Sequence, residues 1–138
     1  MKPFVKIALF VVFFLALAGI FTALYLFNMQ HKDLQKAKPD YVISAVDLQK
    51  AFEENESLAV STYVNKVLEV NGIIESIKKG EQNVLSITLK AGSDLSAVIC
   101  TFPAETDSSK FIPGNQITVR GDCSGFLMDV LLNNCVIL

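Results

Sequence analysis

The chain has 138 residues, 51% of them hydrophobic, and a formal net charge of −2. This length leaves room for one ordinary domain, and the composition excludes disordered, collagen-like, multi-domain and polytopic membrane proteins. Six of the ten phenylalanines lie in the first 27 residues, whereas residues 40–138 hold 46 apolar residues in 99, an ordinary globular fraction. The sequence therefore predicts one membrane segment followed by one small domain.

The membrane segment is an uncharged run over residues 7–27, in which only Gly19 and Thr22 lie outside the apolar set. As a helix, this run spans roughly 32 Å, close to the ~30 Å hydrocarbon core of a bilayer. We expect a transmembrane helix that acts as an uncleaved signal anchor, with residues 1–6 as a cytoplasmic tail.

A cleaved signal peptide is the alternative interpretation of the same run. Lys2 and Lys6 form a basic start, and the small residues Ala16 and Ala18, on either side of Leu17, resemble a cleavage site. The run continues to Phe27, beyond the usual h-region of about 7–15 residues, which favours the anchor. Lipidation near the N-terminus is excluded, because no cysteine precedes Cys100.

The orientation of the segment is only weakly encoded, because lysines lie on both sides of it. A short N-terminal tail that stays inside is usual for a signal anchor, so we expect the domain to be extracytoplasmic, in the periplasm. The polar stretch 28–40 contains Pro39 and predicts a juxtamembrane linker.

The first element predicted in the domain, residues 41–138, is a short helix from Ala45 to Asn55. Ser44 followed by Asp47 is typical of an N-terminal cap, and apolar residues then recur at helical spacing. We interpret the acidic residues at its end as solvated surface rather than a metal site; they are Glu53, Glu54 and Glu56.

After Tyr63 the pattern predicts strands. In the first of them the apolar face changes parity near Gly72, which predicts a bulge or sharp coil there. Alternating apolar residues and turn signals place the five strands at 64–77, 85–89, 98–102, 117–123 and 128–138.

A helix and five short strands predict a mainly β fold, a five-stranded OB-fold-like barrel preceded by a short α-helix. Closing the sheet removes the exposed edges that a small all-β domain would otherwise present. An OB-fold usually has its helix between the third and fourth strands, but here residues 103–113 are short and weakly helical. The predicted barrel is therefore a variant.

Several short motifs together carry a family resemblance. They are residues 44–48 with Phe52, Asn55–Glu56, Ala59, Tyr63, residues 70–72, Cys100 with Phe102, residues 113–121, Cys123, Gly125, Asp129–Val130, Leu132 and Cys135. In this order they resemble the tRNA_anti-like family of small bacterial OB-fold domains, over about residues 41–137. The resemblance implies a domain tethered to the cell envelope and brings no catalytic residue set with it.

Nucleic-acid binding is the function that an OB-fold suggests first, and the charge disfavours it. Residues 40–138 contain 13 acidic and 7 basic residues, a formal charge of −6, which opposes phosphate binding. Phe126 is the one aromatic residue that we place in an exposed loop, and Lys78 with Lys79 forms the one basic spot, so stacking platforms and a basic groove are not predicted.

Catalysis, haem carriage and metal binding are not predicted either. The only histidine is His31, in the linker, so the domain offers no Ser–His or Cys–His pair and no histidine to hold haem. Asp122 and Asp129 flank the last predicted loop as a possible acid–base or cation pair, and we attribute them to turn conformation. We therefore expect no enzyme activity and no cofactor.

The three cysteines, Cys100, Cys123 and Cys135, form no C-x-x-C motif and lie at inward positions of the strands. We predict unpaired buried thiols. If a disulfide forms outside the cytoplasm, a contact between the third and fifth strands favours Cys100 with Cys135.

The function predicted is a non-enzymatic, membrane-tethered OB-fold binding module of the cell envelope. Its ligand would be a protein, a glycan or another envelope component, and the alternative is an OB-fold nucleic-acid-binding protein. The candidate ligand-facing residues lie in two loops and are Lys78 and Lys79 in the first and Ser124, Phe126 and Met128 in the second.

Overall fold

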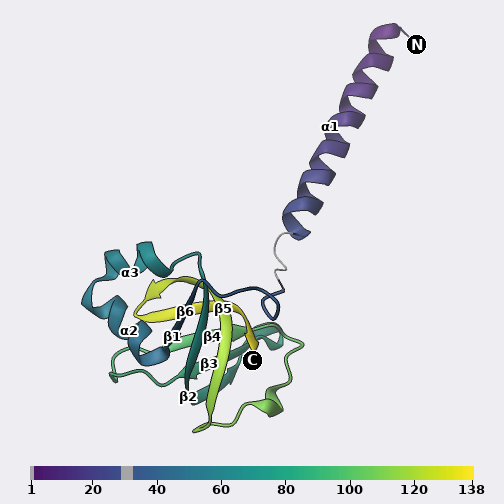
Figure 1. Ribbon diagram of the computed structural model, residues 1–138. Coiled ribbons are helices and arrows are strands. Elements are labelled where there is room, and N and C mark those ends of the chain that lie inside the picture. The colour runs from purple at the N-terminus through teal and green to yellow at the C-terminus, as the bar shows by residue number, and fades with distance from the viewer. Residues whose placement is uncertain (1, 29–32) are drawn as a thin grey trace. The chain divides into compact units, whose positions relative to one another are not determined.

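Figure 1 shows a computed structural model, which describes residues 2–28 and 33–138. The chain divides into two compact units, residues 1–33 and residues 34–138. His31 and most of the first half of the predicted linker lie outside the described residues.

The first unit is the helix α1, Pro3–Asn28. Among the described residues it is the one helix that is long and apolar enough to cross a membrane. It begins at Pro3, four residues before the predicted start, because proline is well accommodated in the first turn of a helix. The Thr22 hydroxyl donates to the Ala18 carbonyl oxygen at 2.8 Å, which satisfies the polar group within an apolar helix.

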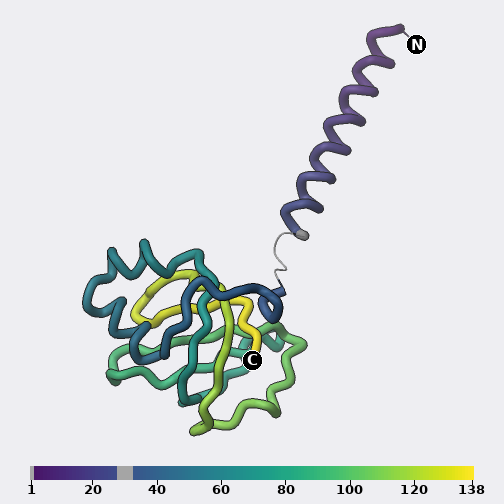
Figure 2. The backbone as a smooth tube through the Cα atoms, in the orientation of Figure 1, coloured from purple at the N-terminus to yellow at the C-terminus, as the bar shows by residue number. Residues whose placement is uncertain are grey.

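The second unit is a closed barrel, and the backbone trace in Figure 2 follows it. Its five strands are β2 Val67–Lys79, β3 Leu85–Leu89, β4 Val98–Phe102, β5 Gln116–Leu127 and β6 Asp129–Ile137. They are hydrogen-bonded in the order β2-β3-β4-β6-β5, and a β2–β5 pairing closes the ring. The pairs are antiparallel except for β4 with β6. The predicted OB-like barrel is confirmed.

A further short strand, β1 Tyr41–Ser44, pairs in parallel with the first half of β2 and was not predicted. Strand β2 therefore has three neighbours along its length: β1, β5 and, from Ile74 onward, β3. The irregularity in β2 lies between Ile74 and Ser76, beyond the predicted position at Gly72. Gly72 instead allows a close approach, since a Cβ atom there would lie 3.0 Å from the Ala45 Cβ atom.

Two helices, α2 Ala45–Glu54 and α3 Glu56–Tyr63, precede β2 where one was predicted. The predicted cap of α2 is confirmed, because the Asp47 N–H donates to the Ser44 hydroxyl oxygen at 3.1 Å. Asn55 separates the helices and caps α3 by accepting the Leu58 N–H at 3.1 Å. Between β4 and β5 the structure describes only a 3₁₀ turn, Ser108–Lys110, in agreement with the weakly helical connection predicted there.

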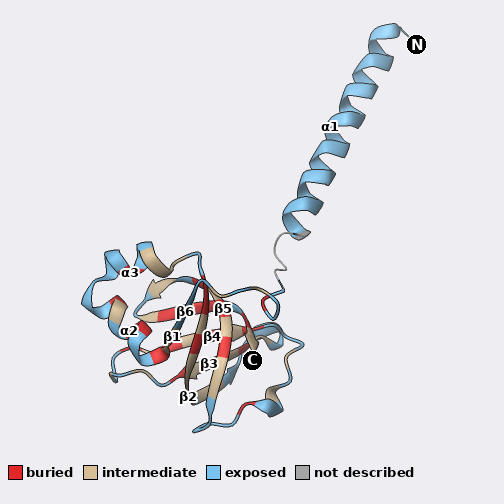
Figure 3. Cartoon of the chain, viewed as in Figure 1, coloured by how far each residue is buried: buried red, intermediate tan, exposed pale blue. Residues whose placement is uncertain are grey.

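The core fills the barrel and continues under α2, as Figure 3 shows by the buried residues along the strands and on that helix. Alternation places Leu85, Ile87 and Leu89 of β3 inward, as predicted. The largest fully buried side chains are Phe52 of α2 and Phe102 of β4. Because the helix contributes a whole ring to this core, the barrel and α2 share one hydrophobic cluster.

The three cysteines are buried free thiols, in agreement with the inward positions predicted for them. Burial raises the pKa of Cys123 to about 11. A hydrogen bond with Cys135, followed by burial, raises the pKa of Cys100 well above its ordinary value. Both thiols are therefore protonated at neutral pH, and the Cys100–Cys135 disulfide stays a prediction.

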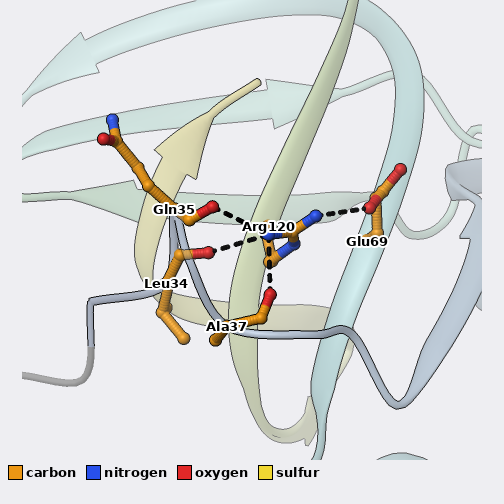
Figure 4. A network of polar contacts seen from close by, with 5 residues as sticks. All are labelled: Leu34, Gln35, Ala37, Glu69 and Arg120. Carbon is orange, nitrogen blue, oxygen red and sulfur yellow. Dashed lines mark hydrogen bonds and ion pairs between the residues drawn. The ribbon is translucent and has the colours of Figure 1, made fainter.

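Arg120 of β5 fixes the segment that leads into the barrel (Figure 4). Its Nη1 atom donates to the carbonyl oxygens of Leu34 at 3.1 Å, Gln35 at 3.2 Å and Ala37 at 2.7 Å. Its Nη2 atom forms an ion pair with Glu69 of β2 at 2.9 Å. Residues 34–37, within the predicted linker, are thus held on the barrel surface; we call this arrangement the Arg120 clasp.

Candidate binding surface

The outward side of β3 and β4 carries short polar side chains. In both strands buried and half-buried residues alternate, so every second side chain points outward. The pairing then places Ser86 opposite Thr101 and Thr88 opposite Ile99. Ser76 of β2 extends the row beside Thr88. This face offers hydroxyl groups and one aliphatic side chain but no ring, and Lys78, which pairs with Ser86, adds a positive charge at its edge.

Lys78 and Lys79 are the last two residues of β2 rather than part of the predicted loop, because the strand continues two residues beyond its predicted end, and both are exposed. They pair with Ser86 and Leu85 at the start of β3, so they border the hydroxyl-bearing face. No other basic residue stands next to them in the chain.

Ser124 and Phe126 do not lie in a loop, which corrects the prediction for the second candidate site. Strand β5 continues to Leu127, and only Met128 separates it from β6. Phe126 stacks on Phe52, with ring centroids 5.3 Å apart and an interplanar angle of 20°. Two register shifts between β5 and β6 break the simple alternation, which is why the sequence pattern does not show this inward contact.

The two predicted loops lie at opposite ends of β3 and β4. Lys79 pairs with Leu85, which pairs with Phe102 at one end. At the other end Leu89 pairs with Val98, which pairs with Val130 just after the Met128 turn. The structure therefore does not bring Lys78 and Lys79 together with Met128.

Three exposed apolar residues lie at the Met128 end, and we call them the apolar projection: Leu95, Leu127 and Met128. They are exposed by 85%, 79% and 79%. Two hydrogen bonds join their segments, from the Ala97 N–H to Asp129 Oδ1 at 2.8 Å and from the Val130 N–H to the Ala97 carbonyl oxygen at 3.0 Å. The sequence signal for Leu95 is an isolated aliphatic residue among Gly, Ser and Asp.

A hollow of about 290 Å³ adjoins the apolar projection. Its charged lining consists of Glu75, Asp94 and Asp129 against Lys90, and Leu95 also lines it. The described residues contain no group of three His, Cys, Asp or Glu residues placed to hold a metal ion. Asp122 is not brought to Asp129, since it pairs with Asn133 farther along the β5–β6 ladder.

A buried glutamine fixes the loop that carries Leu95. Gln49 of α2 is 1% exposed, and its Oε1 atom accepts the Gly92 N–H at 2.8 Å. Its Nε2 atom lies 2.6 Å from the Ser93 hydroxyl and 2.7 Å from the Ser96 hydroxyl. Hydrogen bonds from Ser96, from Ser93 and from Gln49 lower the pKa of Glu53, the nearest member of the acidic cluster.

Replacement of Gln49 by alanine is expected to lower the free energy of unfolding by about 2 kcal/mol, because the Gly92 N–H loses its buried partner. Urea unfolding followed by circular dichroism measures this difference. Lys50→Ala is the matched control on the same helix: its ion pair with Glu54 spans 3.8 Å between side chains that are 67% exposed, so about 0.5 kcal/mol or less is expected. Equal losses in the two variants would contradict the role assigned to Gln49.

Comparison with known proteins gives a family match and structural similarities. A family model described as tRNA_anti-like matches residues 1–137. No curated protein matches the chain. The chain is similar to a lipoprotein from Klebsiella pneumoniae subsp. pneumoniae whose crystal structure is named as that of a proposed nucleic acid-binding protein. The two sequences are 20% identical, and the match covers 70% of this chain and 90% of that one, with a TM-score of 0.53. At this identity the likeness shows the fold alone.

Two further solved structures are more distant. The S. pombe Stn1–Ten1 complex matches at 22% identity over 52% of this chain and 57% of that one, with a TM-score of 0.41. Entamoeba histolytica asparaginyl-tRNA synthetase with asparaginyl-adenylate matches at 8% identity over 73% of this chain and 24% of that one, with a TM-score of 0.46.

Proposed function

The chain belongs to the tRNA_anti-like family, and from that membership we propose that it is a non-enzymatic binding module held at the membrane by α1. Its barrel lies outside the cytoplasm, and its ligand is a protein of the cell envelope. The observation that carries this proposal is the composition of the barrel surface. An acidic barrel with a ring-free, hydroxyl-bearing β3–β4 face and an exposed apolar projection suits a protein ligand better than a polyanion.

The non-enzymatic assignment is supported by the state of the reactive side chains. Cys100 and Cys123 have raised pKa values and are buried, so neither supplies a thiolate at neutral pH. The domain sequence contains no histidine, which removes the usual general base at this pH.

Nucleic acid is the alternative ligand, and the name of the Klebsiella lipoprotein is the reason to test it. Here the rings that would stack on bases contact each other instead: Phe126 stacks on Phe52, and Phe102 lies against Phe111 with centroids 5.0 Å apart. Residues 40–138 carry a formal charge of −6, which repels phosphate.

We expect the full chain in detergent to bind single-stranded DNA and RNA with a dissociation constant weaker than about 100 μM at physiological salt. Fluorescence anisotropy with labelled oligonucleotides measures this. The matched variant is Lys78→Glu with Lys79→Glu, because it removes the two lysines that are neighbours in the sequence. Tighter, salt-dependent binding that the double variant abolishes would establish the alternative.

The extracytoplasmic placement predicts the behaviour of fusions after Leu138. Alkaline phosphatase fused there is expected to be active, and a green fluorescent protein fused there and exported in the unfolded state is expected to be dark. The comparison uses the same chain with both reporters, normalised to the amount of fusion protein. An inactive phosphatase together with a bright fluorescent fusion would place the barrel in the cytoplasm.

The ligand class is tested by photo-crosslinking in living cells from Thr88, on the hydroxyl-bearing face, and from Lys79 at its border. A discrete protein adduct that survives purification and is identified by mass spectrometry supports the proposal. An adduct that carries carbohydrate assigns a glycan ligand instead. Adducts with lipid alone from every exposed position of the barrel would contradict a binding module.

A further inference from the structure

The apolar projection has an unusual backbone at its tip. Met128 has a φ angle of 66°, in the left-handed region that favours glycine or asparagine. Its side chain is nevertheless large and 79% exposed, so packing within the barrel does not explain it. A long apolar side chain at a backbone position that disfavours it, and that the barrel does not cover, favours a contact outside the chain.

The projection is held in place before any partner arrives. Asp129 and Ala97 tie the turn to the Leu95 loop, and Gln49 ties the same loop to α2. A surface whose backbone is fixed by such bonds loses less conformational entropy on binding than a mobile loop would. The three apolar side chains are therefore presented on a preorganised base.

The charge beside the apolar projection is mainly negative. The hollow that Leu95 lines contains three carboxylates, from Glu75, Asp94 and Asp129, and the single ammonium group of Lys90. Glu53 adds a fourth carboxylate near the same loop through its contacts with Ser93 and Ser96, at 3.1 and 3.0 Å. This hollow favours a cationic side chain next to an apolar contact.

We propose that the apolar projection and the adjoining acidic hollow form a docking surface for a protein that presents an apolar depression beside a lysine or arginine side chain. Leu127 and Met128 enter the depression, and the cationic side chain enters the hollow. This inference rests on the proposed function and names the part of the barrel that performs it.

Other occupants fit the charges less well. An anionic bilayer surface carries the same sign as the hollow, and so does a nucleic acid. A second copy of this chain docking by the same surface would bring the two acidic hollows towards each other, because a two-fold interface apposes identical patches. A basic protein is the occupant that the charge complementarity selects.

The first experiment places a photo-crosslinking residue at Leu95 in the full-length protein in living cells. The matched control position is Ile112, which is also an exposed aliphatic residue, 55% exposed, and precedes the opposite end of β5. We expect the crosslinking residue at Leu95 to give one discrete protein adduct and the residue at Ile112 not to give this adduct. The captured protein is identified by mass spectrometry, purified and used in a binding assay with the full chain in detergent.

The binding assay compares four variants at low and high salt. Met128→Gly and Leu127→Ser are each expected to weaken binding by at least tenfold at either salt concentration. Asp94→Lys is expected to weaken it about tenfold at low salt and much less at high salt. Ile112→Ser should change it by less than twofold. Met128→Gly relieves the left-handed backbone, so its melting temperature should be equal to or above that of the parent, which separates lost binding from lost folding.

The outcomes distinguish failure of the docking surface from failure of the proposed function. Adducts from Leu95 that contain only lipid or only a second copy of this chain would overturn the inference. So would binding that is unchanged by Met128→Gly and insensitive to Asp94→Lys. A protein captured from Thr88 or Lys79 but not from Leu95 would overturn the inference and leave the proposed function standing. Failure to capture any protein from all of these positions would overturn both.

Discussion

Replacement of Arg120 by alanine is expected to lower the free energy of unfolding by about 3 kcal/mol. The side chain is 13% exposed and its partner Glu69 is 23% exposed, so the ion pair is largely shielded from water. Truncation leaves the Glu69 carboxylate without its counter-charge and three carbonyl oxygens without their donor. Urea unfolding of the full chain in detergent measures the loss.

The same variant should free residues 34–37 from the barrel. Limited trypsin cleavage after Lys36 is expected to be several-fold faster than in the parent protein, because the segment then opens without unfolding the barrel. Glu69→Gln is the matched control, since it removes the charge but keeps an acceptor for Nη2. An Arg120→Ala protein with unchanged trypsin kinetics and a loss below about 1 kcal/mol would show that the clasp does not hold the segment.

Replacement of Phe52 by alanine is expected to cost more, about 4 kcal/mol, because it deletes one of the largest buried side chains. The ring is 1% exposed and lies between Tyr63, at 6.1 Å, and Phe126, at 5.3 Å between centroids. A single domain is stable by only about 5–15 kcal/mol, so the variant loses a large share of its stability. Denaturant unfolding and the melting temperature both report it.

Leu58→Ala provides the control, since Leu58 lies on the neighbouring helix α3 and is 62% exposed. Its replacement should change the free energy of unfolding by about 0.5 kcal/mol or less. Phe52→Leu should recover most of the loss, because it refills the site without the ring stack. A similar cost for Leu58→Ala and Phe52→Ala would mean that α2 does not contribute to the barrel core.

The elements that the sequence predicts well have strong local signals. The Ser44 cap depends on residues three positions apart, and the inward set of β3 follows from strict alternation. The apolar helix depends only on composition over a window. In each case the determining interaction lies within the element itself or on one face of it.

The elements missing from the prediction depend on distant partners or lack an apolar stripe. Strand β1 has four residues, and its register is set by β2, which lies beyond two helices. Helix α3 buries only Ala59, so hydrophobic periodicity does not reveal it, although the Asn55 cap is a readable signal.

The candidate site was partly predictable for the same reasons. Lys78 and Lys79 lie at an exposed strand end, as their place before Gly80 indicates. Phe126 was misplaced because the β5–β6 bulges shift its parity, and only the structure shows its stack on Phe52. The contacts of Arg120 with residues 34–37 join positions more than 80 apart in sequence, which no local pattern encodes.

The placement of β6 between β4 and β5 determines when this protein can fold during its synthesis. Strand β4 ends at Phe102, yet the strand that covers its free edge is completed only at Ile137, 35 residues later. At about 5–20 residues per second, the ribosome takes roughly 2–7 s to make that stretch. Throughout this interval β4 has an unpaired edge, and the ring cannot close. A growing chain that already carries its apolar helix therefore has to be protected from edge-to-edge association until its last strand is complete.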